Sequence, residues 1–168
     1  MDIFDFALKM ERESEKYYRD QANKTKFSDL KTLLENLAVA EARHYKIVEA
    51  LRLQNTEALP DEEVLTETKN IFVSYIKDAE ALRKAISIDK IKEDQIDVYR
   101  LALVKENESV EVYEKMLSQA HNPNVKAVLE RLIKEEQSHA KVMDEIIDLL
   151  NKVSDWVEAA EFNHQEDY

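Results

Sequence analysis

The sequence predicts an all-α fold, a four-helix bundle built from two copies of one helical hairpin and joined by a single long crossover. Three observations carry this prediction. The 168 residues include no Gly and only two Pro, whereas a sheet with tight turns normally needs glycine and long helices do not. Apolar residues recur at spacings of three and four, which is the helical period. The sequence also aligns with itself, without a gap, after a shift of 95 positions, which indicates a duplicated unit.

The repeat is clearest in two pairs of segments. ERESEKYY (11–18) aligns with ENESVEVY (106–113), and LENLAVAEARH (34–44) aligns with LERLIKEEQSH (129–139). Within each half the apolar period is interrupted once, so each half reads as two helices. A chain of this length suits one domain with a sizeable core. The repeat therefore predicts two similar hairpins that pack together.

We expect four bundle helices, over about residues 2–24, 28–54, 93–121 and 123–151. The first hairpin turns at NKTKFS and the second at HNPN. In the second turn, Asn122 is the expected N-cap and Pro123 the first helical residue.

The bundle helices leave two segments unassigned. The crossover, residues 55–92, is long enough for one or two extra short helices. With a crossover of this length the second and third bundle helices run parallel, which is the one-crossover topology of ferritin-like bundles. We therefore expect one bundle domain, residues 1–151. The tail, residues 152–168, lies outside the repeat and has room for a short helix through Trp156 and Val157.

Composition excludes several classes of function. The formal net charge is −12, and no basic stripe offsets it, which argues against nucleic-acid binding. The absence of Cys excludes disulfides, thiolate metal sites and a Cys₄ iron centre within this sequence. The first residues, MDIFDFALKMERE, do not resemble a signal peptide. No apolar run approaches the roughly 18 residues of a membrane span. We therefore expect a soluble, cytoplasmic protein.

Six polar residues occupy the inward, otherwise apolar stripes of the four helices. Glu11 and Glu41 are equally distant from the first turn, and Glu106 and Glu136 are equally distant from the second. Each pair therefore lies at one height, roughly 22 Å from its turn at about 1.5 Å per residue. A histidine follows three residues after the second glutamate of each pair, on the same face. The six residues are Glu11, Glu41, His44, Glu106, Glu136 and His139.

This polar layer has two possible explanations. It could be a satisfied polar network, because isolated buried polar groups are usually paired within the protein. However, four buried carboxylates cannot all be ionised without compensation, and no Lys or Arg lies near them on the inner stripes. Two divalent cations would balance four carboxylates, and neutral imidazoles would complete their coordination. The complete set favours a dinuclear metal site.

The arrangement resembles the ligand set of ferritin-like di-iron proteins, a Glu on each of two helices and Glu-x-x-His on each of the other two. Glu11 and Glu106 match the single glutamates, and EARH (41–44) and EQSH (136–139) match the two paired motifs. The pattern LxxxExxH, together with Tyr seven residues after each single Glu, resembles the rubrerythrin family in particular. The resemblance covers about residues 2–150.

The sequence departs from that family in two respects. Rubrerythrins proper carry a C-terminal rubredoxin domain with a Cys₄ iron centre, which this sequence without Cys lacks. Rubrerythrins also have an extra glutamate three residues after the ligand of the third bundle helix. Here that position is Ser109, with Ser14 as its counterpart in the first half.

The resemblance implies a non-haem di-iron oxidoreductase that reduces hydrogen peroxide or dioxygen. It implies two iron ions per chain, with Mn or Zn as possible substitutes, held by the four glutamates and two histidines. Tyr18 and Tyr113 would donate hydrogen bonds to ligating carboxylates. Electrons would come from a separate donor protein such as a rubredoxin, and the chain would form a homodimer.

Other functions are compatible with the same bundle. A ferroxidase or iron-handling protein of the ferritin type uses similar ligands, although the short acidic tail argues against a cage. A structural bundle whose metal only cements the core is another alternative. Manganese catalase shares the bundle and the ligand types.

Overall fold

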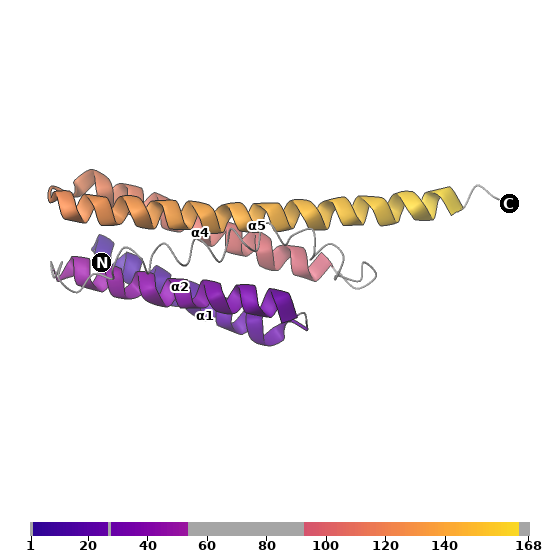
Figure 1. Ribbon diagram of the computed structural model, residues 1–168, viewed down its shortest axis with the longest axis horizontal. Coiled ribbons are helices and arrows are strands. Elements are labelled where there is room, and N and C mark those ends of the chain that lie inside the picture. Colours follow the sequence, from indigo (N-terminus) through magenta and orange to yellow (C-terminus); the bar gives the residue numbers. More distant parts are fainter. Residues whose placement is uncertain (1, 27, 54–92, 165–168) are drawn as a thin grey trace.

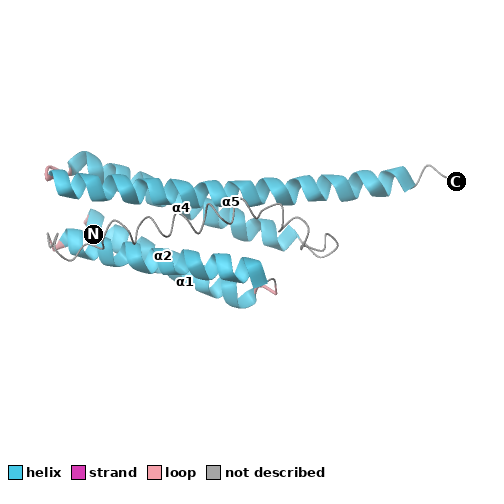
Figure 2. Ribbon diagram, viewed as in Figure 1, coloured by secondary structure: helices cyan, strands magenta, loops and turns pink. Residues whose placement is uncertain are grey.

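In the computed structural model the described residues, 2–26, 28–53 and 93–164, form four helices and no strand (Figures 1 and 2). The helices are α1 (Ile3–Lys24), α2 (Ser28–Arg52), α4 (Glu93–Gln119) and α5 (Pro123–His164). None of them is long and apolar enough to cross a membrane. The expected extra helices of the crossover fall on residues outside this described part.

The four helices form two antiparallel hairpins stacked as two layers. The most extensive contacts are within the pairs α1–α2 and α4–α5, while α1 packs against α4 and α2 against α5 between the layers. The turns of the two hairpins lie at opposite ends of the bundle, so α2 and α4 run in the same direction (Figure 1). This is the predicted one-crossover, ferritin-like topology, and it confirms the fold class.

Local capping explains where α1 and α5 begin. The Asp2 side chain accepts a hydrogen bond from the Asp5 backbone N–H at 2.8 Å and caps α1. At the second turn, the side chain of Asn122 accepts a hydrogen bond from the Asn124 N–H at 2.9 Å, and Pro123 is the first residue of α5. The predicted cap is therefore present.

The last helix is longer than expected. The sequence predicts an end near residue 151 and a separate short helix in the tail, but α5 runs without a break to His164 and extends past the other helices (Figure 2). The physical reason is the absence of any stop signal, because no Gly or Pro follows Pro123 in this segment.

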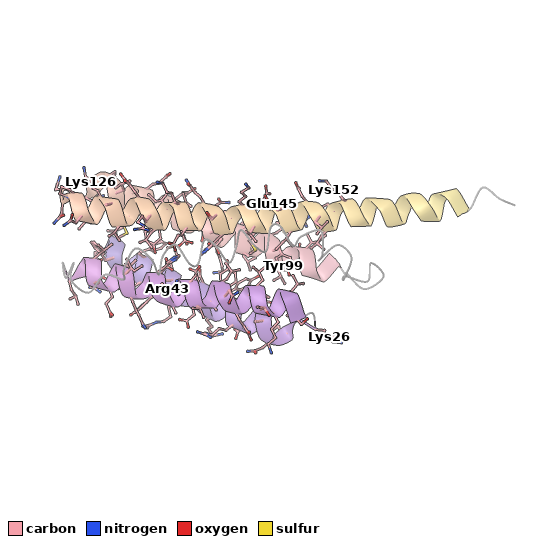
Figure 3. All side chains as sticks on the ribbon, viewed as in Figure 1. Lys26, Arg43, Tyr99, Lys126, Glu145 and Lys152 are labelled. Atoms are coloured by element: carbon pink, nitrogen blue, oxygen red, sulfur yellow. The ribbon has the colours of Figure 1, made fainter. Side chains whose placement is uncertain are left out.

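Two apolar clusters fill the bundle on either side of its middle. Tyr99, a member of one of them, lies on α4 (Figure 3). One cluster surrounds Tyr18, Leu34 and Tyr99, near the first turn. The other surrounds Ile47, Tyr113 and Leu132, near the second turn. Because each hairpin has its turn at a different end, both clusters contain residues from both hairpins. The polar layer lies between them and is closed off from solvent at both ends.

Candidate metal centre

The structure brings all six sequence-predicted residues together at the middle of the bundle. Glu11 comes from α1 and Glu106 from α4, while α2 and α5 each supply a glutamate and a histidine. None of the six is more than 2% exposed. Their common height follows from the turn positions, since α1 and α2 meet around residue 26 and α4 and α5 around residue 121.

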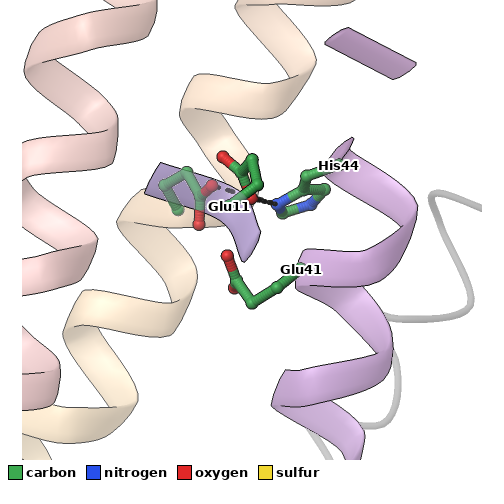
Figure 4. A group of neighbouring side chains, drawn as sticks. Glu11, Glu41 and His44 are labelled. Carbon is green, nitrogen blue, oxygen red and sulfur yellow. Dashed lines mark ion pairs between the residues drawn. The ribbon is translucent and has the colours of Figure 1, made fainter. Parts of the chain in front are cut away.

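The six residues form two overlapping groups of potential ligand atoms. In one group are Glu11, Glu41, His44 and Glu136, and in the other Glu41, Glu106, Glu136 and His139. Within each group the atoms lie within 4.8 Å of one another. Figure 4 shows three members of the first group pointing toward a common centre. Glu41 and Glu136 belong to both groups, so the arrangement has two adjacent positions with two shared carboxylates.

Distances show how the histidines and Glu136 face each other. His44 Nδ1 lies 3.0 Å from Glu136 Oε1 and 3.7 Å from Glu11 Oε2. His139 Nδ1 lies 3.1 Å from Glu136 Oε2, 3.2 Å from Glu106 Oε2 and 3.5 Å from Glu41 Oε1. The two imidazole rings are nearly parallel, with centroids 5.7 Å apart. Each histidine therefore presents Nδ1 to one group, and Glu136 presents one oxygen to each histidine.

Several of these buried atoms lack a hydrogen-bond partner in the part of the chain that the structure describes. They are Glu11 Oε2, Glu41 Oε1, His44 Nδ1 and both carboxylate oxygens of Glu136. His44 Nδ1 and Glu136 Oε1 are close, but they are not aligned as a hydrogen bond. Ionised carboxylates only accept hydrogen bonds and cannot satisfy one another. None of the buried polar residues described is Lys or Arg. Oxygen and nitrogen donors converging in this way fit bound divalent metal ions.

Burial and mutual repulsion change the protonation of the cluster in the absence of metal. Burial and the charges of Glu136, Glu106 and Glu11 raise the pKa of Glu41 well above its usual value. Burial raises the pKa of Glu106 to about 7, although His139 opposes this shift. Burial disfavours the charged rings of His44 and His139, but the neighbouring carboxylates outweigh it and raise both pKa values. Burial also opposes ionisation of Glu136, yet the two histidines lower its pKa.

The metal-free protein is therefore expected to lose stability as the pH rises from about 5 to 8. A folded-state pKa above the unfolded value means that the native state holds more protons in that interval, so unfolding becomes easier as pH increases. Glu106 alone, with its pKa raised from 4.5 to about 7, would contribute roughly 3 kcal/mol. The pKa values of Glu41 and both histidines are also raised, so these groups act in the same direction. The pKa of Glu136 is lowered, so its effect on stability falls below this pH interval. Urea unfolding of chelator-treated protein at several pH values measures the trend.

The metal-saturated protein is the control for that titration. Metal ligation requires deprotonated carboxylates and neutral imidazoles, so the loaded protein should show a flat or rising trend over the same interval. A metal-free protein whose stability stays constant or increases with pH would contradict the assigned burial of these charges.

Two tyrosines connect the hairpins at the centre. The Tyr18 hydroxyl donates a hydrogen bond to Glu106 Oε1, and the Tyr113 hydroxyl donates one to Glu11 Oε1. Burial raises the pKa of both tyrosines, so both remain protonated donors. Each tyrosine occupies one oxygen of its glutamate and leaves the other facing a histidine. The structure thus places both predicted tyrosines against the glutamates of the opposite hairpin.

Sequence reasoning missed Glu135, whose Oε2 lies 3.0 Å from His44 Nε2. A signal was present, because Leu132, Glu135, His139 and Val142 continue a helical stripe and are all buried. The sequence prediction rests on the central stripe through Glu136 alone, and Glu135 lies beside that stripe. At the position of the family's extra glutamate, the buried Ser109 donates to the Lys105 carbonyl at 3.1 Å and brings no further carboxylate.

The fold and the site together define the class of protein. A one-crossover helical bundle with a buried group of four glutamates and two histidines, contributed by all four helices, is a ferritin-like protein with a carboxylate–histidine site suited to metal. The family model for rubrerythrin matches the chain over residues 2–147 and 97–168, and the chain belongs to the rubrerythrin family. Comparison with curated proteins and with solved structures gave no match.

Proposed function

We propose that the protein is a non-haem di-iron oxidoreductase of rubrerythrin type, which reduces hydrogen peroxide or dioxygen with electrons from a separate donor protein. The observation that supports this most directly is the sharing of Glu41 and Glu136 between two adjacent ligand groups. A single metal position would be sufficient for Lewis-acid chemistry and would not by itself indicate a redox reaction. Two positions with shared carboxylates suit reactions in which a pair of metal ions acts on one small oxygen species.

The six residues divide into two roles in this proposal. Glu41 and Glu136, which belong to both groups, would help to hold both ions, while Glu11 with His44 and Glu106 with His139 would each help to hold one. Iron bound there would polarise the oxygen species and change its oxidation state during the reduction. Zn could polarise the oxygen species but has no redox chemistry. Tyr18 and Tyr113 orient the other two glutamates through hydrogen bonds. The apolar clusters above and below exclude bulk water from the centre.

The balance of the reaction sets requirements on the protein. Reduction of one hydrogen peroxide to two waters consumes two electrons and two protons. The electrons would come from a donor protein such as a rubredoxin, since this sequence has no Cys for an iron–sulfur centre. We also propose a homodimer as the working assembly, and its size in solution would distinguish it from a ferritin-like shell.

Anaerobic loading with Fe(II), followed by stopped-flow mixing with hydrogen peroxide or with dioxygen, tests the proposal. We expect two irons per chain and faster formation of near-ultraviolet di-ferric absorption with peroxide. Zn(II)-loaded protein is the redox-inert control. Faster oxidation by dioxygen that continues beyond two irons would favour a ferroxidase. Stoichiometric uptake without oxidation by either reagent would favour a metal-cemented structural bundle.

A further inference from the structure

Glu135 is a buried carboxylate that belongs to neither ligand group. It lies on α5, directly before Glu136, and is 9% exposed. Its Oε2 is 3.0 Å from Nε2 of His44, which lies on α2 in the other hairpin. The opposite ring nitrogen, His44 Nδ1, faces the first ligand group and lies 3.0 Å from Glu136 Oε1. The imidazole is thus held between one carboxylate outside the centre and others inside it.

This geometry determines which nitrogen can bind a metal. A neutral imidazole has one N–H donor and one nitrogen with a lone pair. An ionised carboxylate only accepts hydrogen bonds, so a neutral His44 satisfies Glu135 by carrying its proton on Nε2. The lone pair then lies on Nδ1, which faces Glu11, Glu41 and Glu136. A carboxylate on the far nitrogen of a histidine also makes that histidine a more basic and better oriented ligand.

We propose that Glu135 is a positioning residue that fixes the Nε2–H tautomer and the ring orientation of His44, and so completes the metal position formed with Glu11, Glu41 and Glu136. This inference rests on the metal binding within the proposed function and is independent of the redox reaction. It assigns Glu135 an effect on one of the two metal positions.

The repeat supports a role confined to one position. Each of the six predicted ligands has an identical residue at the matching place in the other half, but Glu135 aligns with Ala40. Glu135 contacts His44 through a bond between the hairpins, whereas His139 belongs to the other ligand group. Loss of the Glu135 carboxylate should therefore weaken binding at the position beside His44 and leave the position beside His139 nearly unchanged.

Calorimetric titration of the metal-free full chain with Zn(II) tests this inference. The variants are Glu135→Leu, which removes the acceptor, and Glu135→Gln, which keeps the shape and an oxygen acceptor. Glu130→Gln, at an exposed position on the same helix, is the matched control. We expect two equivalents of Zn(II) in the parent and the control. In Glu135→Leu one equivalent should remain tight and the other should weaken about 10- to 100-fold, with Glu135→Gln in between.

A second readout follows the histidine itself. In ¹⁵N-labelled, Zn(II)-loaded parent, long-range ¹H–¹⁵N spectra should show His44 protonated at Nε2 and metal-bound at Nδ1. If the leucine variant folds poorly, Glu135→Gln, which retains the core volume, takes its place in both measurements. Two equivalents at parental affinity in both variants, or equal weakening of both equivalents, would overturn the inference.

These outcomes separate the inference from the proposed function. A parent that binds two Zn(II) ions but, when iron-loaded, reduces neither peroxide nor dioxygen would refute the oxidoreductase and leave the role of Glu135 standing. A parent that takes up no metal would refute both. An active iron-loaded parent whose Glu135 variants keep both Zn(II) equivalents would refute the role of Glu135 alone.

Discussion

Replacing Glu136 with alanine is expected to abolish tight binding of both metal ions, whereas replacing Glu11 should remove only one. Glu136 faces both groups, with Oε1 3.0 Å from His44 Nδ1 and Oε2 3.1 Å from His139 Nδ1. Glu11 belongs only to the group that contains His44. Changes in residues that merely orient ligands already weaken metal binding by about 10- to 100-fold. Loss of a carboxylate shared by two ions should therefore exceed about 100-fold at both positions.

Metal content after anaerobic Fe(II) loading and desalting measures this difference. The expected stoichiometry is two irons per chain in the parent, about one in Glu11→Ala and none in Glu136→Ala. Glu108→Ala is the control, because Glu108 is exposed and two residues from Glu106 on the same helix. A Glu136→Ala protein that retains one tightly bound iron would show that the two positions do not share this carboxylate.

Much of this centre could be predicted from the sequence because, in a helical hairpin, the number of residues between a side chain and the turn fixes its position along the bundle axis. The turns around residues 26 and 121 place Glu11 level with Glu41 and Glu106 level with Glu136. The repeat then requires the two hairpins to present the same polar layer. Helical periodicity turns the four glutamates inward, and their burial follows from the apolar residues above and below them.

The contacts between side chains of different hairpins within the polar layer could not be predicted in the same way. Which carboxylates are shared depends on how far apart the two hairpins pack, and that distance is set by contacts between helices that are remote in sequence. The contact between Glu135 and His44 is of this kind, since it joins α5 to α2. The end of α5 was missed for a different reason, because helix propensity changes too gradually to mark a boundary without Gly or Pro.

Replacing the shared carboxylate of Glu41, as Glu41→Leu, is expected to stabilise the metal-free protein. At pH 8 the parent must hold buried carboxylates whose oxygens include several without a hydrogen-bond partner in the described part of the chain. Burial and the charges of the neighbouring carboxylates raise the pKa of Glu41 well above its usual value, so its ionised form is poorly compensated. Exchanging poorly compensated buried charges for well-packed apolar side chains of similar volume often stabilises a protein by about 1–4 kcal/mol. We expect a gain of this size in the free energy of unfolding, measured with urea after chelator treatment. The gain should shrink toward pH 5, where Glu106 and Glu41 are protonated in the parent.

Metal should reverse the order of stability. Saturation at about 100 times the dissociation constant stabilises a native state that binds one ion by about 2.7 kcal/mol, and the variant lacks a ligand that belongs to both groups. The control is Glu130→Leu, at an exposed position, which should change neither measurement appreciably. If Glu41→Leu were instead less stable than the metal-free parent at pH 8, Glu41 would be a member of a satisfied polar network. That result would favour the structural alternative that the sequence left open. A stabilised variant that no longer responds to metal would show that Glu41 is kept in the core for binding at the expense of stability.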